Sequence, residues 1–194
     1  MMHDLLADAV AEHRYRALFT ERAYLNYIRA NGINTRASIG FSGPTCAAMI
    51  LDCGNQRFEI SDDREAFPGF VCLAFDHDGV TPIDLVAWPL DRPKHVLSMF
   101  GRAGMLGLWQ ATNAGTYAMG RPLRLHRTPL EWMQSDCHGA AIVTPHLARW
   151  TLLEISGQIV AQDQAHGRDL LALVQSLVDP SRFLAPASMP RIAA

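Results

Sequence analysis

The stretch VCLAFDHDGVTPIDLVAW, residues 71–88, decides how the middle of this chain folds. Two runs of apolar, β-prone residues flank Asp76-His77-Asp78-Gly79. Glycine accepts a positive φ angle and aspartate bonds to nearby backbone N–H groups, so Asp-Gly between two such runs favours a tight turn. The stretch therefore predicts an antiparallel hairpin with strands at roughly 70–76 and 80–88.

The segments around this hairpin predict an α+β fold in a single mixed α/β domain over residues 1–194. Apolar residues at helical spacing predict a helical segment over 4–31, as one helix or two. Glycines and a proline predict a loop over 34–45, followed by antiparallel strands over 46–90. The pattern over residues 95–178 predicts a mixture of helices and strands. The first of these elements is a predicted helix from residue 95 that is interrupted by glycines. The proline-containing tail over 180–194 is expected to be irregular.

The last third of the chain carries the clearest helix starts. Thr128, Pro129 and Glu131 combine a capping box with proline at the first helical position, and Asp163 can cap another helix. Alternating strands and helices over 128–178 predict a small βαβα unit with parallel strands. We expect the core to contain Val71, Leu73, Phe75, Leu85, Val86, Ile142, Val143, Ile159, Val160, Leu170 and Val174.

The composition is that of a globular protein with one core. Of the 194 residues, 49% are hydrophobic and 19% are charged, with a formal net charge of −2, which gives no overall attraction to nucleic acid or acidic membranes. The N-terminus lacks the pattern of a secretory signal, and no apolar run approaches the length of a membrane span. The four cysteines have no CxxC spacing, so we expect free, buried thiols in a cytoplasmic protein that does not bind membranes.

Charge is distributed unevenly along the chain. Residues 52–91 hold nine acids and two bases, whereas residues 92–130 hold six bases and no acid. Candidate binding residues in the basic segment are Arg102, Arg121, Arg124 and Arg127. They could contact nucleic acid, but the overall charge favours two other roles, which are neutralising the acidic segment within the fold or binding a protein partner of opposite charge.

The run that ends in Asp76-His77-Asp78-Gly79-Val80 resembles the first motif of the haloacid dehalogenase-like phosphatases. The resemblance covers about a dozen residues. It implies that Asp76 is a nucleophile or metal ligand, that Asp78 is a general acid or second ligand, and that Mg²⁺ neutralises phosphate charge. Thr144 and Asp163, each at the end of an expected strand, would match later motifs. No lysine occurs over 145–162, where that family has one.

The same pattern also resembles the toprim fold of primases and topoisomerases, for which Glu59 would supply the upstream glutamate. A plain hairpin turn explains the two aspartates with fewer requirements, since it needs no partner residues elsewhere. Loop carboxylates could bind a metal in either case.

A second candidate site lies where expected parallel strands end and helices begin, because parallel sheets bind ligands at this edge. Thr144, Pro145, Asp163 and His166 would meet there. Asp163 and His166 also have a simpler role at the start of the last helix, where aspartate caps the first turn.

No catalytic constellation satisfies its expected spacing. The histidines and Cys137 lack zinc-ligand spacing, and GRAGMLG, residues 101–107, has the wrong spacing for a dinucleotide loop. The sequence therefore favours a non-catalytic binding or protein-interaction module with no cofactor or metal, which could form a homo-oligomer. The alternatives are a Mg²⁺-dependent phosphate-processing enzyme using Asp76 and Asp78, and a nucleic-acid-binding protein using the basic segment over 92–127.

Overall fold

The N-terminal part of the chain is helical. The computed structural model describes residues 2–18 and 22–177, with α1 at Met2–Arg16, α2 at Arg22–Ala30 and α3 at Thr35–Ser42. The predicted helical segment is confirmed as two helices, α1 and α2. The loop predicted over 34–45 is wrong, because α3 occupies most of it. Asn34 explains the helix, since its side chain accepts hydrogen bonds from the N–H groups of Arg36 and Ala37 and so caps α3.

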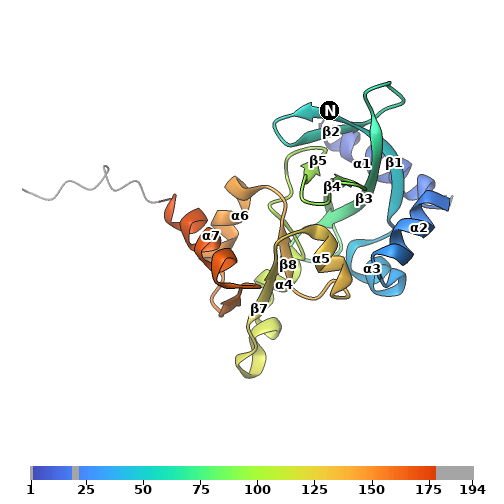
Figure 1. The fold of residues 1–194 in the computed structure, drawn as a ribbon. Helices are drawn as coiled ribbons and strands as arrows, with labels where there is room; N and C mark the ends of the chain where they lie inside the picture. Colours follow the sequence, from blue (N-terminus) through green and yellow to red (C-terminus); the bar gives the residue numbers. More distant parts are fainter. Residues whose placement is uncertain (1, 19–21, 178–194) are drawn as a thin grey trace, which may run out of the picture.

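The acidic middle of the chain forms a closed barrel (Figure 1). Its strands are β1 (Cys46–Gly54), β2 (Arg57–Ile60), β3 (Phe67–Phe75), β4 (Pro82–Pro89) and β5 (Leu97–Ser98), in the order β1-β2-β5-β4-β3. The hairpin predicted from residues 71–88 is confirmed, with Leu73 opposite Leu85 in antiparallel β3 and β4. Gly79 has a φ of +72° in the turn, as the Asp-Gly signal requires.

A second sheet follows, in the order β6-β8-β7-β9. Its strands are β6 (Met105–Leu106), β7 (Leu123–His126), β8 (Ala140–Ile142) and β9 (Ile159–Val160). The helices around it are α4 (Leu108–Thr112), the 3-10 segment η1 (Ala114–Gly120), α5 (Pro129–Gln134), α6 (Pro145–Glu154) and α7 (Gln164–Gln175). The predicted succession β8, α6, β9, α7 is confirmed, and β7 lies between β8 and β9, parallel to both.

The helix predicted from residue 95 is wrong. Residues 97–106 instead hold β5, β6 and the segment between them, and only α4 is helical. The cause is Asp84 of β4, which is fully buried. Its carboxylate accepts hydrogen bonds from the N–H groups of Phe100, Arg102 and Ala103 and from the Ser98 hydroxyl. In a helix, these N–H groups would donate to carbonyl groups of the preceding turn. Here they donate to the Asp84 carboxylate of β4 instead, so the segment does not form a helix.

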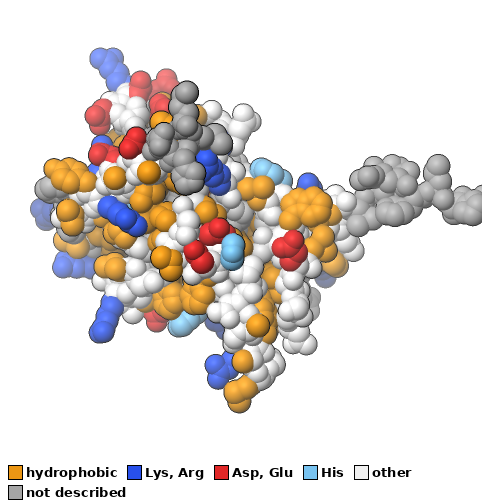
Figure 2. Space-filling view, turned by 180° about the vertical axis from the view of Figure 1, so that it is seen from behind, with side chains coloured by type: hydrophobic (Ala, Val, Ile, Leu, Met, Phe, Trp, Pro, Cys, Tyr) orange, Lys and Arg blue, Asp and Glu red, His pale blue; other side chains and the backbone are white. Residues whose placement is uncertain are grey.

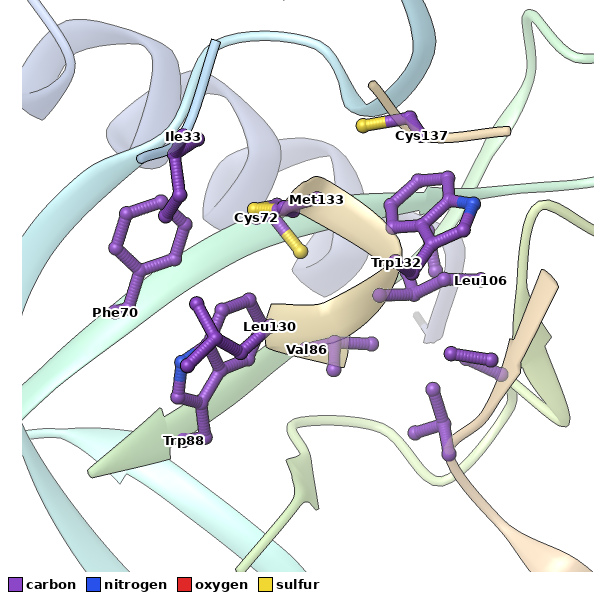
Figure 3. Packing of buried hydrophobic residues seen from close by; sticks show 14 of the residues in the cluster. Ile33, Phe70, Cys72, Val86, Trp88, Leu106, Leu130, Trp132, Met133 and Cys137 are labelled. Carbon is purple, nitrogen blue, oxygen red and sulfur yellow. The ribbon is translucent and has the colours of Figure 1, made fainter. Parts of the chain in front are cut away.

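The barrel and the second sheet share one hydrophobic cluster. Figure 3 shows Phe70, Cys72, Val86 and Trp88 of the barrel strands packed with Leu130, Trp132 and Met133 of α5, and Trp88 and Met133 are fully buried. Of the expected core residues, five are buried, namely Val71, Leu73, Leu85, Val86 and Val143. The predicted burial of Val160 is wrong, because its side chain is 41% exposed on the edge strand β9.

Cysteine placement departs from the prediction at one position. All four cysteines are free thiols, and Cys46, Cys72 and Cys137 are buried, but Cys53 is exposed at the end of β1. Within residues 2–18 and 22–177, no helix combines the length and apolar character needed to cross a membrane. The predicted irregular tail, 180–194, lies outside the described residues.

Candidate functional site

The two aspartates of the hairpin turn are engaged by their own loop. Asp78 accepts hydrogen bonds from the N–H groups of Val80 and Thr81 and, at 2.6 Å, from the Thr81 hydroxyl. These bonds lower the pKa of Asp78 to about 2. The Oδ1 atom of Asp76 accepts from both the backbone N–H and the Nδ1 of His77. Both carboxylates therefore stabilise the turn, as the simple hairpin interpretation requires.

Asp163 follows β9, the edge strand of the second sheet, and has its own hydrogen-bond partners. It caps α7 by accepting from the N–H of His166, and it pairs with the Arg127 guanidinium at 2.8 Å. These two contacts lower the pKa of Asp163. Glu59 is exposed on β2. No group of three or more His, Cys, Asp or Glu side chains in the described parts of the chain is arranged to hold a metal ion. The structure thus does not gather Asp76, Asp78 and Asp163 into one such group.

The four candidate arginines have different surroundings. Arg127 pairs with Asp163 and, at 3.5 Å, with Asp169 of α7. The N–H of Arg102 bonds to Asp84, and its guanidinium lies 5.7 Å from the Phe100 ring. Arg121 and Arg124 are exposed and make no ion pair with any carboxylate in the described residues. Arg121 and Arg124 are therefore available to a ligand, since none of the described carboxylates neutralises them.

Two adjoining hollows lie along β7, and we call them together the β7 groove. The first has a volume of about 510 Å³ and is lined by Arg124, His126, Glu131, Gln134, Ser135, Val160, Ala161 and Gln162. The second has a volume of about 480 Å³ and is lined by Gln110, Thr116, Arg121, Pro122, Leu123, Arg124, Ser135, Asp136, His138 and Gly139. Arg124 and Ser135 line both hollows.

The alternation of β7 creates this groove. Leu123 and Leu125 are buried in an apolar cluster with residues of α4, α6 and α7, while Arg124 and His126 line the first hollow. His126 was not among the predicted binding residues, although the alternating pattern of Leu123, Arg124, Leu125 and His126 indicates that it shares a face with Arg124. Glu131, Gln134 and Gln162 were not predicted either, because only the packing of α5 and β9 brings them to β7.

Buried polar contacts hold the walls of the groove. His126 is buried, and its Nε2 lies 2.9 Å from the His138 carbonyl oxygen, to which it donates a hydrogen bond. Burial lowers the pKa of His126. The amide of Gln110 donates to the Cys137 carbonyl and accepts from the Gly139 N–H. Glu131 completes the predicted capping box with Thr128.

The two remaining candidates, Thr144 and His166, also flank strand ends. Thr144 is the N-cap residue of α6, and its buried hydroxyl has no hydrogen-bond partner within residues 2–18 and 22–177. His166 is buried in the first turn of α7, where its Nδ1 accepts a hydrogen bond from the Gln162 N–H. Burial and the nearby Arg127 lower the pKa of His166. Neither residue lines the β7 groove.

No known family, curated protein or solved structure matches this chain.

Proposed function

We propose that this chain is a non-catalytic binding module that holds an acidic segment of a protein partner in the β7 groove. The observation that carries the proposal is the position of Arg124, which lines both hollows and has no carboxylate partner in the described residues. Three residues further along, Arg127 is neutralised by two aspartates. A charge left unpaired at the centre of a groove favours a ligand that brings its own carboxylate.

The remaining lining fits a peptide. Gln134 and Gln162 offer amide donors and acceptors, and the exposed Val160 offers a small apolar contact on edge strand β9. Extended peptides expose the same mixture of backbone amides and side chains. Glu131 and Asp136 also line the groove, and their negative charges disfavour a ligand as densely charged as a polyphosphate.

Nucleic acid is less favoured at this groove for a second reason. Single-stranded nucleic acids are usually held by bases stacked on aromatic side chains. The residues that line the two hollows include no phenylalanine, tyrosine or tryptophan. The lining of the groove therefore offers positive charge but no aromatic ring on which a base could stack.

The test uses a fluorescein-labelled peptide of alternating glutamate and glycine, titrated with the full chain and followed by anisotropy. We expect Arg124→Gln to weaken binding about tenfold, because a charge-assisted bond contributes on the order of 1.5–3 kcal/mol. Arg168→Gln is the matched control, because Arg168 is exposed on α7 and does not line the groove.

A charge reversal sharpens the test. The Arg124→Glu variant should no longer bind the glutamate peptide and should gain affinity for the corresponding lysine peptide, as contact between residue 124 and the peptide requires. Equal affinity of the wild type, Arg124→Gln and Arg168→Gln for the glutamate peptide would contradict the proposal.

A further inference from the structure

Helices α2 and α3 form a fixed corner separated by the four residues 31–34. Helix α2 ends with both bonds of a Schellman motif, from the Ile33 N–H to the Ile28 carbonyl and from the Gly32 N–H to the Arg29 carbonyl. Gly32 has the positive φ of +63° that this motif needs. Asn34 then caps α3. The geometry between the two helices is therefore set by local hydrogen bonds, as in a helix–turn–helix unit.

The inner face of this corner is anchored to the rest of the molecule. The Trp88 Nε1 of the barrel donates to the Tyr27 hydroxyl of α2 at 3.0 Å. Phe41 of α3 stacks on Trp109 of α4, with ring centroids 5.7 Å apart. The Gln134 amide of α5 donates to the carbonyl of Asn31 in the turn. The corner is thus held on its inner side by the barrel, α4 and α5.

The outer face is basic and partly apolar. Its exposed residues are Arg22, Leu25, Asn26 and Arg29 on α2, and Thr35, Arg36, Ile39 and Gly40 on α3. Residues 22–51 contain three arginines and no acid. No described carboxylate pairs with these arginines. Ile39 is 59% exposed. Figure 2 shows Lys and Arg side chains among hydrophobic ones on the left, the side where the N-terminal helices lie.

We infer that this α2–α3 face binds double-stranded DNA, with α3 in the major groove. A helix with its side chains is about 10–12 Å wide, which matches a major groove about 12 Å wide. Arg36, in the first turn of α3, would contact a phosphate at the edge of this groove, where the start of the helix approaches the backbone. Arg22 and Arg29, seven residues apart on one face of α2, would contact the phosphate backbone. Ile39 would pack on thymine methyl groups.

This inference is independent of the β7 groove, because the two surfaces share no residue. Duplex DNA is favoured over RNA because the major groove of A-form RNA is too narrow for a helix. It is favoured over a second copy of this chain because two such faces would bring six arginines together without acids.

The experiment measures binding of the full chain to a fluorescein-labelled mixed-sequence DNA duplex by anisotropy over a series of salt concentrations. Three phosphate contacts predict a slope of log affinity against log salt near −2.7, which is about a 40-fold loss between roughly 50 and 200 mM salt. R22Q/R29Q/R36Q should lose at least about tenfold in affinity at the lowest salt, and Arg29→Gln alone should reduce the slope by about 1.

The matched control is R64Q/K94Q/R168Q, which removes the same charge from exposed residues outside the face. It should keep most of the affinity, and Arg124→Gln should keep the wild-type affinity, which separates this surface from the β7 groove. Equal losses in the two triple variants would overturn the inference. So would salt-independent binding, undetectable binding, equal affinity for a duplex RNA of the same sequence, or equally strong competition by polyglutamate.

Discussion

The Asp84 carboxylate accepts a hydrogen bond from the Ser98 hydroxyl at 2.6 Å, and both side chains are buried. The same carboxylate accepts bonds from three backbone N–H groups between β5 and β6. Asp84 belongs to the barrel and β6 belongs to the second sheet. One buried carboxylate therefore fixes the segment that leads the chain from the barrel to the sheet that carries the β7 groove.

Asp84→Asn should lower the free energy of unfolding by about 3 kcal/mol or more, because an amide nitrogen would face N–H groups that have lost their charged acceptor. Ser98→Ala should cost less, about 1–2 kcal/mol, because it removes one donor to Asp84 and the acceptor of the Gly101 N–H. Urea unfolding measures both values. Asp91→Asn is the control, since Asp91 is exposed. An Asp84→Asn protein as stable as the control would show that these bonds do not stabilise the fold.

Stability should fall as the pH drops below about 6.5. Burial lowers the pKa of His13, His126 and His166 below the ordinary value of 6.5, so the unfolded chain binds protons at a higher pH than the folded chain does. The contribution of these neutral rings is complete above pH 6.5 and is lost as the pH falls toward their folded pKa values.

Urea unfolding at about pH 7.5 and about pH 5.5 checks this expectation. His13→Gln should reduce the difference between the two pH values, because His13 is fully buried and bonds to the Pro44 carbonyl. His146→Gln, at an exposed position of α6, should leave the difference unchanged. A free energy of unfolding that rises toward pH 5.5 would contradict the assignment of these histidines as neutral, buried groups.

Two glycines with similar backbone angles should respond differently to alanine. Gly139 and Gly120 have φ values of +88° and +72°, so alanine is strained at both. At Gly139 an added Cβ would also clash with the backbone carbonyl of Arg124, whereas nothing lies within 4 Å at Gly120. Gly120→Ala should cost about 1 kcal/mol and Gly139→Ala clearly more, at least about 3 kcal/mol. Equal losses in thermal or urea unfolding would mean that β7 and the Gly139 segment separate easily.

Millimolar Mg²⁺ should leave the unfolding temperature of the wild type unchanged. The oxygens of Asp78 accept from its own loop, and Asp163 pairs with Arg127. A metal present at 100 times its dissociation constant would add about 2.7 kcal/mol, which thermal unfolding detects easily. A Mg²⁺-induced rise in the wild type that is absent in Asp76→Asn would instead support the Mg²⁺-dependent phosphate-processing enzyme.

The local signals of the sequence determined the turns and helix starts of this protein. Asp-Gly at 78–79, the capping box of Thr128 and Glu131, and the cap at Asp163 all appear in the structure where the sequence places them. Each of these features depends on hydrogen bonds between residues no more than five positions apart, so a short stretch of sequence contains all the groups that form it.

Tertiary structure alone decided the segments whose hydrogen bonds and charges have distant partners. Residues 97–106 have the apolar spacing of a helix, but Asp84 takes their N–H groups into long-range bonds. Arg124 and Arg127 look alike in the sequence, yet among the described residues only Arg127 pairs with carboxylates, which belong to Asp163 and Asp169 at the start of α7. The β7 groove depends on α5 and β9 meeting at one strand, and no local pattern encodes a contact between residues so far apart in the chain.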